Sequence, residues 1–442
     1  MRARRVLATC LGALALAACS AATHEPLPAG IGGAPPLPAP EQSLVPTLNA
    51  AKAVGWESHE APLAAEGFEV DAYARNLRHP RWLYVLPNGD VLVAETNAPD
   101  RPDDSPGIKG WIAGKVMARA GATVPSANRI TLLRDANRDG RVELQVTLLD
   151  KLSSPFGMAL VGDRLFVANS DAIVAFPYRE GDVRIDAPGT VLAPLPAGTI
   201  NHHWTKSLVA SADGRTLFVG VGSNSNIAEN GLDKETNRAA ILSVDVASAS
   251  TQVFASGLRN PVGMAWQPET GALWTVVNER DELGNDLVPD YLTSVRMGDF
   301  FGWPYSYFGQ NLDPRIAPQR PDLVAGARAP DYALGSHTAP LGLAFYDADA
   351  FPARYRGGAF IGQHGSWNRR PRSGYQVVFV PFTRGKPSGV MEPVLTRFLD
   401  AEGQARGRPV GVAVDATGAL LVADDVGGIV WRLRAVKAKP AA

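Results

Sequence analysis

The chain has 442 residues, of which 45% are hydrophobic and 20% are charged. This composition is typical of a folded globular protein and excludes a disordered or membrane-spanning chain. The chain has 43 lysines and arginines against 44 aspartates and glutamates. It therefore lacks the excess of basic residues that would indicate a nucleic-acid partner. With 44 glycines and 35 prolines, the chain is rich in turns, which disfavours a helical bundle.

The N-terminus has the pattern of an export signal. Arginines precede an apolar run over residues 6–18, which is shorter than the about 20 residues that a spanning helix needs. The run ends in Leu-Ala-Ala-Cys, which resembles a bacterial lipobox and implies lipidation of Cys19. The alternative is ordinary cleavage that leaves Cys19 unmodified. The other cysteine, Cys10, lies in the signal, so no disulfide is expected.

The domain organisation follows from this signal. Residues 1–18 are predicted to be a lipoprotein signal, 19–60 an Ala/Pro-rich extended tether, 61–436 the folded domain and 437–442 a tail. We therefore expect a periplasm-facing protein that is held at the cell envelope, with the outer membrane favoured, only by its N-terminal lipid.

An internal repeat predicts the fold. A turn glycine followed by an apolar strand recurs six times, at Gly89, Gly162, Gly214, Gly271, Gly358 and Gly418. A second apolar strand precedes each glycine, and four of these strands open with Pro-x-Gly-x-Ala, which crowded strands near an axis would require. Six hairpins, with room for two more strands each, predict an all-β six-bladed β-propeller. The alternative is a pair of β-sandwiches. Phe68–Ala74 is expected to pair with Ile429–Leu433 and close the ring.

Polar residues gather at one predicted end of the propeller. They lie just before the first strand of each hairpin (the leading segments) and just after its second strand (the exit loops). Five of the seven histidines are there: His79, His202, His203, His337 and His364. Because these segments meet around one axis, we expect a polar pocket that suits an anionic ligand bound among sugars.

At these residues the chain resembles a known family. The relevant stretches are Asn-His-His-Trp at 201–204, Gly-Leu-Arg-Asn-Pro-Val-Gly at 257–263, Asn-Glu-Arg-Asp-Glu-Leu-Gly at 278–284, Phe-Gly-Trp-Pro at 301–304, Ala-Pro-Leu-Gly-Leu-Ala-Phe-Tyr at 339–346 and Gly-Arg-Pro-Val at 407–410. In combination they resemble the soluble quinoprotein sugar dehydrogenases, most of all the sorbosone dehydrogenase branch, over roughly residues 65–435. The resemblance implies a propeller that binds pyrroloquinoline quinone (PQQ) and Ca²⁺ and oxidises an aldose or a sugar aldehyde.

The resemblance also implies residue roles. His203 falls at the position of the general base, and a neutral imidazole can take a hydroxyl proton near pH 7. Arg259 and Asn260 fall on the pair that contacts the quinone. Arg408 falls on one of two arginines that meet the cofactor carboxylates, and Val410 replaces the second.

Further departures concern the cofactor lysine and the orientation of the base. The loop 363–369 has no lysine, so His364 or Arg369 is expected to substitute for it. His202 stands where the glucose enzymes have an acid that orients the base. Either His202 plays that part differently, or Asn201 or Asp424 does.

Calcium has two candidate sites. The resemblance implies binding by the backbone carbonyls of Glu279 and Arg280, with Asp281, Glu282 and Asp286 adding nearby charge. The segment Asp135–Glu143 has the first half of an EF-hand loop, and either binds Ca²⁺ or forms an Asx-rich hairpin turn. Trp303, Tyr305 and Tyr307 are expected either to stack on a sugar or to pack in a blade core.

The predicted function is PQQ-dependent oxidation of an aldose or a sugar aldehyde such as sorbosone, with His203 assisting hydride transfer. The partners would be the sugar and an unidentified electron acceptor. One alternative is a Ca²⁺-dependent lactonase-type hydrolase, whose metal Glu95, Asn169 and Asn224 could hold. The Arg259 and Arg408 pair argues against it, because a neutral lactone needs no cation cluster. The other alternative is a binding propeller without enzymatic activity.

Overall fold

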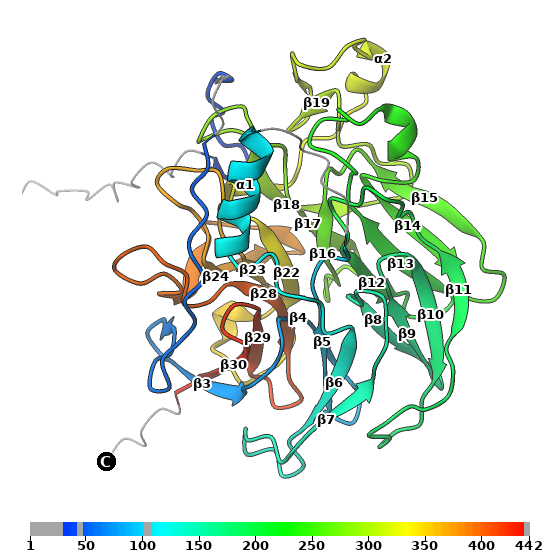
Figure 1. Ribbon diagram of the computed structural model, residues 1–442, viewed down its shortest axis with the longest axis vertical. Coiled ribbons are helices and arrows are strands. Elements are labelled where there is room, and N and C mark those ends of the chain that lie inside the picture. Colours follow the sequence, from blue (N-terminus) through cyan, green and yellow to red (C-terminus); the bar gives the residue numbers. More distant parts are fainter. Residues whose placement is uncertain (1–29, 42–46, 101–107, 437–442) are drawn as a thin grey trace, which may run out of the picture.

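The computed structural model describes residues 30–41, 47–100 and 108–436. Within them, six antiparallel sheets are arranged around a central axis (Figure 1), so the predicted six-bladed β-propeller is confirmed. The innermost strands of neighbouring blades contact one another around the ring, and between blades one and two the Leu160 N–H donates to the Tyr84 hydroxyl (3.0 Å). No helix of the described residues is both long and apolar enough to cross a membrane.

The first three blades each have four strands in sequence order. Blade one contains β4 (Pro80–Val85), β5 (Val91–Glu95), β6 (Arg129–Arg134) and β7 (Leu144–Leu149). Blade two contains β8 (Met158–Val161), β9 (Arg164–Ala168), β10 (Ala172–Pro177) and β11 (Thr190–Pro194). Blade three contains β12 (Lys206–Ala210), β13 (Thr216–Val221), β14 (Ala240–Asp245) and β15 (Thr251–Ser256).

The last three blades each take in a strand from the N-terminal part of the chain. Blade four contains β16 (Pro261–Trp266), β17 (Leu273–Val277), β18 (Pro289–Val295), β21 (Tyr332–Ser336) and β1 (Ile31–Gly32). Blade five contains β22 (Pro340–Phe345), β23 (Ala359–Gln363), β24 (Gln376–Val380), β27 (Glu392–Thr396) and β2 (Leu63–Ala64). Blade six contains β28 (Pro409–Val414), β29 (Leu420–Asp424), β30 (Ile429–Ala435) and β3 (Phe68–Ala74).

Short elements decorate the blades. The helix α1 (Ile108–Arg119) lies in the connection between β5 and β6. The insertion between β18 and β21 of blade four contains β19 (Ser306–Tyr307), β20 (Asn311–Leu312) and α2 (Pro321–Val324). The insertion lies inside blade four, because β21 returns to that sheet. The remaining elements are η1 (Leu232–Glu235), η2 (Ala353–Tyr355), β25 (Phe382–Thr383) and β26 (Lys386–Pro387).

The ring closes as expected. The strand β3 pairs antiparallel with β30, with Phe68 opposite Ala435 and Ala74 opposite Val430. The first strand of the ring thus completes the last blade, which removes the unpaired edges that an open ring would expose.

The repeated Pro-x-Gly motif is explained by crowding at the axis. A Cβ atom on Gly342 would lie 2.2 Å from the carbonyl oxygen of Val410 in the next blade, so no side chain fits there. The residue before each such glycine helps to fill the axis. Phe156, Val262, Leu341 and Val410, from four blades, belong to one buried hydrophobic cluster. The axis is therefore packed rather than open.

The N-terminal segment does not leave the propeller as a free tether where the structure describes it. Residues 47–56 cross from blade five to blade six, and we call them the strap. The Asn49 side chain donates to the carbonyl of Arg369 (2.7 Å), Ala51 is fully buried, and the Trp56 indole N–H donates to Asp424 (2.7 Å). The strap therefore lies against exit loops of the propeller.

Candidate functional site

The leading segments and exit loops meet at one end of the propeller, as expected. Hydrogen bonds join them within single blades, from Thr96 N–H to the His79 carbonyl (3.1 Å) and from His364 N–H to the Ala339 carbonyl (2.9 Å). We call this end the mouth. The strands of each inner hairpin are joined at the opposite end by the glycine turns, and Gly89 has φ of 97° there. The hairpin geometry therefore gathers the polar residues of six blades.

His203 is held in one tautomer. Its Nδ1 lies 2.7 Å from the carbonyl oxygen of Ser223 and 3.1 Å from the Ser223 hydroxyl. Because a carbonyl oxygen only accepts, Nδ1 carries the hydrogen and Nε2 is left with a lone pair. Burial and then the positive charge of Arg259 hold the pKa of His203 well below its usual value, so the ring is neutral at pH 7. This arrangement suits a general base.

Asn260 and Arg259 lie beside His203. A Cβ on Gly222 would lie 2.4 Å from Cβ of His203 and 2.3 Å from Oδ1 of Asn260, so the two side chains flank the same glycine. That Asn260 oxygen is buried and has no hydrogen-bond partner among the described residues. A buried, unsatisfied acceptor indicates a ligand or water with a donor group.

Arg259 is anchored by protein groups on several sides. Its Nη1 donates to the Glu279 carbonyl (2.6 Å), and its Nη2 donates to Asn226 Oδ1 (3.0 Å) and Asp281 Oδ2 (3.1 Å). Asp281 also accepts from the Asn368 side chain (2.7 Å). These donors, with Arg259 the largest favourable one, lower the pKa of Asp281 to about 2 despite burial.

His337 is a second histidine of the mouth with the opposite electrostatic setting. Its Nδ1 lies 3.4 Å from Asp281 Oδ1, and its Nε2 lies 3.0 Å from the carbonyl of Gly284. Both neighbours accept hydrogen bonds, so they favour the doubly protonated ring. Against the opposing effect of burial, Asp281 raises the pKa of His337. His337 is thus a cation near pH 6, whereas His203 is neutral.

A second cluster surrounds Asp425, and we call it the Asp425 cluster. Its Oδ2 accepts from Arg81 Nη1 (2.7 Å) and from His364 Nε2 (2.8 Å), and lies 3.7 Å from His79 Nε2. Arg408 lies close enough to lower the pKa values of His364 and Arg81. The cluster joins side chains from blades one, five and six.

Charge in the Asp425 cluster is unbalanced. Burial lowers the pKa of His364 to about 4, and burial also lowers that of His79, so both rings are neutral at pH 7. Arg81 is then paired with Asp425, whereas no carboxylate accepts from the Arg408 side chain in the described part of the chain. The Nε atoms of both arginines are buried and lack a partner among the described residues. A buried cation with an unused donor favours an anionic ligand.

Arg408 is positioned by the strap. Its Nη2 donates to the carbonyl of Ala51 (3.3 Å) and to the hydroxyl of Tyr375 (3.2 Å), and the guanidinium lies over the Tyr375 ring. Its backbone N–H donates to Asp424 (2.8 Å), which also accepts from the indoles of Trp56 and Trp431. The strap therefore forms one wall of the mouth.

Other predicted residues lie apart from these clusters. Arg369 donates to the Asn285 carbonyl (2.9 Å) and to Asp286 (2.6 Å), and no hydrogen bond in the described part of the chain joins it to His364. Arg280 is fully buried and donates to the carbonyls of Pro304 and Ser306. Its side chain thus holds the blade-four insertion.

Two of the three predicted orienting residues, Asp424 and Asn201, are hydrogen-bonded elsewhere. Asp424 already has four donors, including the backbone N–H groups of Arg408 and Gly427, and burial raises its pKa to about 6. Asn201 Oδ1 accepts from Arg238 (3.0 Å). Ser223 orients His203 instead, and sequence reasoning missed this role because the contact uses a backbone carbonyl.

The three aromatic residues at 303–307 are buried, as the core-packing alternative expects. Tyr307 is buried in the hydrophobic core of blade four, with Phe301 and Tyr291. Trp303 is 4% exposed, and its indole N–H donates to the Asn226 carbonyl (2.9 Å). Trp303 therefore ties the insertion to the exit loop of blade three.

The residues considered for a lactonase metal differ in availability. The Glu95 carboxylate is occupied by Arg129 Nε (2.8 Å) and by the hydroxyl of Thr131. The Oδ1 atoms of Asn169 and Asn224 are buried without a partner among the described residues. Asn169 and Asn224 thus each keep a free acceptor for a metal ion, whereas the carboxylate of Glu95 is already hydrogen-bonded.

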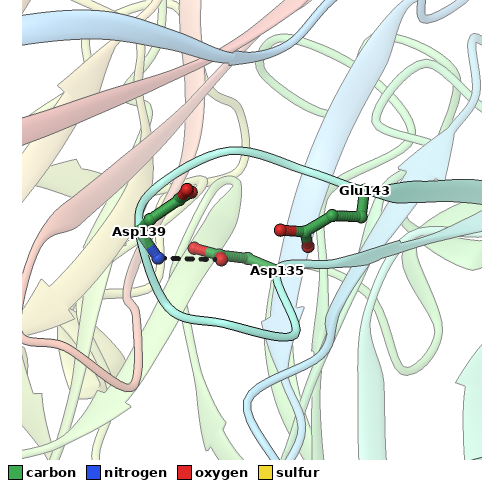
Figure 2. A group of neighbouring side chains, drawn as sticks. All are labelled: Asp135, Asp139 and Glu143. Atoms are coloured by element: carbon green, nitrogen blue, oxygen red, sulfur yellow. Dashed lines mark hydrogen bonds between the residues drawn. The ribbon is translucent and has the colours of Figure 1, made fainter.

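The acidic loop at 135–143 lies away from the mouth. Asp135, Asp139 and Glu143 bring carboxylate oxygens within 4.8 Å of one another (Figure 2), and Asp135 accepts from the backbone N–H of Asp139 (3.1 Å). Nearby, a cavity of about 810 Å³ lies at the seam between β3 and β30, lined by Asp139, Phe351 and Arg432 among others. None of the residues predicted to bind PQQ or to act as the base lines this cavity.

Arg81 is a candidate binding residue that sequence reasoning missed. Arg81 occupies a position near the start of the innermost strand that is apolar or serine in the other five blades. Its charge at this position was the feature of the sequence that could have identified it. The equivalent residues are Phe156, Ser207, Val262, Leu341 and Val410. A Cβ on Gly411 would lie 2.8 Å from the Arg81 carbonyl, so the strand that carries Val410 runs directly beside Arg81.

Comparisons with known proteins find two family models that match parts of the chain. A family model described as Glucose / Sorbosone dehydrogenase matches residues 164–366, and one described as TrAA12-like matches residues 322–436. An aldose sugar dehydrogenase of Escherichia coli is 28% identical over 186 residues, which cover 39% of this chain and 48% of that protein. A PQQ-dependent pyranose dehydrogenase of Coprinopsis cinerea is 24% identical over 436 residues, covering 84% of this chain and 54% of that protein.

Solved structures show the same fold. A calcium structure of the Trichoderma reesei Carbohydrate-Active Enzymes Family AA12 protein has a TM-score of 0.69 at 20% identity, covering 86% of this chain and 98% of that one. The chain spans about half the length of the two curated relatives described above. These matches confirm the resemblance seen in the sequence and relate the chain to the soluble PQQ-dependent glucose/sorbosone dehydrogenase-like family.

Proposed function

We propose that this protein oxidises a sugar, an aldose or a sugar aldehyde such as sorbosone, with PQQ as the electron acceptor in the site. The observation that carries the proposal is the pairing, at one mouth, of a neutral histidine with a free Nε2 and two buried guanidinium groups with unused donors. The first is a base, and the second is a receptor for an anion. The relatives named above are sugar dehydrogenases.

The residues present fit PQQ, which is planar and carries several carboxylates. Arg408 and Arg81 would hold carboxylate groups through their unused Nε donors. Asn260 would meet a donor with its unsatisfied Oδ1. When bound, PQQ supplies an electrophilic quinone that takes a hydride equivalent from the sugar carbon.

His203 has the chemistry to take the proton. Its Nδ1–H is donated to the Ser223 carbonyl, so only Nε2 can receive the proton of a sugar hydroxyl. The Ser223 carbonyl would then stabilise the charged ring, because it faces the N–H that strengthens as a donor on protonation. The positive charge of Arg259 disfavours the protonated His203 ring. The ring should therefore release the proton readily after each turnover.

Calcium is proposed as the second cofactor, since a calcium structure exists for the Trichoderma reesei neighbour. The carbonyl of Glu279 does not fit the expected ligand role in this arrangement, because it accepts a hydrogen bond from Arg259 at 2.6 Å. A divalent cation at that oxygen would face a guanidinium. No step of the reaction is therefore assigned to the metal.

The test uses soluble protein without its lipid. PQQ and Ca²⁺ are added singly and together, and reduction of an artificial dye is followed across a panel of aldoses and sugar aldehydes. Activity that requires PQQ and is lost in His203→Ala, while PQQ still binds by absorbance titration, is the expected result. No PQQ binding would overturn the proposal. A panel of lactones with Ca²⁺ would then test the hydrolase alternative, which the free acceptors of Asn169 and Asn224 favour.

We also propose that the protein is attached to the cell envelope through lipidated Cys19, which lies outside the described residues. The support is the basic and apolar N-terminal pattern that ends in Leu-Ala-Ala-Cys. Mass spectrometry of the N-terminal peptide should find a lipidated Cys19. Cys19→Ser should release the protein from the membrane fraction, and an unmodified N-terminus would contradict the assignment.

A further inference from the structure

The exit loop of blade three contains a buried carboxylate that the proposed reaction does not use. Glu235, at the end of η1, is 9% exposed. One of its oxygens accepts from the backbone N–H of Asn224 (2.7 Å), and the other accepts from the hydroxyl of Ser225. Both partners belong to residues 223–226, which we call the arch.

One end of the arch holds the base. The Ser223 carbonyl fixes the tautomer of His203. The Ser223 hydroxyl donates to the carbonyl of Ser225 (2.5 Å), so this end is tied to a residue that Glu235 grips. The orientation of the His203 ring therefore depends on the arch keeping its shape.

The other end of the arch holds the cation beside the base. The Asn226 carbonyl accepts from Arg259 Nε (3.3 Å), and its Oδ1 accepts from Arg259 Nη2 (3.0 Å) and from the backbone N–H of Asp281 (2.9 Å). The Asn226 carbonyl also accepts from the Trp303 indole (2.9 Å). One arch of four residues thus positions His203 and Arg259 together.

The Glu235 carboxylate satisfies both donors in the middle of the arch. The Asn224 N–H and the Ser225 hydroxyl are both donors, and they approach different oxygens of Glu235. A glutamine could still accept from the Asn224 N–H, but its NH₂ group would face the Ser225 hydroxyl, which would have to rotate and accept, and both bonds would lose the carboxylate charge. Burying a carboxylate has a free-energy cost, and the two hydrogen bonds to Asn224 and Ser225 offset that cost here.

We propose that Glu235 is a positioning residue, which holds the base His203 and the cofactor cation Arg259 in their working geometry by clamping the arch. The proposal rests on the proposed function for its kinetic consequence, but its structural consequence can be measured without any turnover.

The experiment compares Glu235→Gln with Asp233→Asn in the full chain. Asp233 lies on the same short helix, but it is exposed and pairs with Lys234, so it is the matched control. Long-range ¹⁵N NMR of histidine-labelled protein reports the tautomer of each ring, and His203→Ala assigns the signal. Wild type and Asp233→Asn should show a single Nδ1–H tautomer for His203, and Glu235→Gln should show a mixture.

The kinetic arm uses protein loaded with PQQ. Glu235→Gln should lower kcat by about tenfold with little change in KM, because the sugar still binds while the base is misdirected. Ser225→Ala removes one donor without introducing a repulsive group, and should lower kcat in the same direction by less. It also serves as the second variant if Glu235→Gln fails to fold.

The outcomes separate the two proposals. An unchanged His203 tautomer in folded Glu235→Gln and Ser225→Ala proteins would overturn the positioning role, whatever the activity. A mixed tautomer in a protein whose wild type oxidises no sugar would support the positioning role and contradict the proposed function.

Discussion

At the scale of single residues, the mouth holds three of its histidines in two charge states. His203 and His364 are neutral at pH 7 because they are buried near arginines, whereas His337 is stabilised as a cation by Asp281. Sequence position predicted that these rings would meet, but not their charges. Charge depends on backbone carbonyls such as that of Ser223, which leave no signature in a sequence.

The depressed pKa of His203 predicts the pH dependence of turnover. Since a base must be unprotonated, kcat/KM should fall as the pH falls through the His203 pKa, which lies below the usual 6.5. Between pH 7.5 and 6.5 this acidic limb should be flat. The measurement is kcat/KM against pH with PQQ-loaded protein, and an acidic midpoint at or above 6.5 would contradict the assignment.

His364 predicts a pH dependence of stability. Its pKa is about 4 in the folded protein and about 6.5 when unfolded, so the unfolded chain binds more protons between these values and stability falls as the pH falls. From pH 7 to 5 the loss from this group is about 2 kcal/mol. In His364→Asn that part of the loss should disappear, as measured by urea unfolding at both pH values. An equal loss in both proteins would argue against it.

At the scale of elements, the strap and the inner strands differ in how far the sequence predicted them. The sequence predicted the hairpins, the glycine turns and the pairing of β3 with β30. It could do so because each blade repeats the same pattern of apolar strands and turn glycines. The strap has no such periodicity. Its Ala/Pro composition is typical of a linker, and the contacts that hold Ala51 and Trp56 come from loops far away in the chain.

The strap predicts an effect of Trp56→Phe on cofactor binding. The change removes the indole N–H that Asp424 accepts, while Asp424 also anchors the backbone of Arg408. The free energy of unfolding should fall by about 1–2 kcal/mol, and the affinity for PQQ should fall as well. Trp266→Phe removes a comparable indole bond, to Ala210 (2.8 Å), and should leave PQQ affinity unchanged. Urea unfolding and absorbance titration measure the two effects.

The crowded axis predicts the cost of a single methyl group. In Gly342→Ala, the new Cβ would meet the Val410 carbonyl oxygen at 2.2 Å and the Val412 nitrogen at 2.8 Å, so two blades must separate. We expect a loss of about 3 kcal/mol in the free energy of unfolding. Gly114→Ala in α1 has open space around it and should be neutral or stabilising by up to about 1 kcal/mol. Similar effects for both variants would contradict the packing argument.

At the scale of the whole molecule, ring closure makes the six blades one cooperative unit. Blade six is complete only when β3 lies on β30, and the site needs blades one, five and six to meet at Asp425. A chain that ends at Gly428 lacks β30 and should lose both PQQ binding and cooperative unfolding, as followed by circular dichroism in urea. Retention of a native-like transition would show that five blades are sufficient.

The seam between β3 and β30 also has a consequence for the protein during its own synthesis. The strand β3 leaves the ribosome early, and its partner is made almost last, so β3 waits through most of translation without the neighbour that completes its hydrogen bonds. Such a long-range pairing is slow to form and leaves an adhesive edge in the meantime. The strand β3 carries two acidic side chains, Glu69 and Asp71, at alternate positions. While β3 is unpaired, these charges should disfavour its pairing with the β3 strand of another nascent chain.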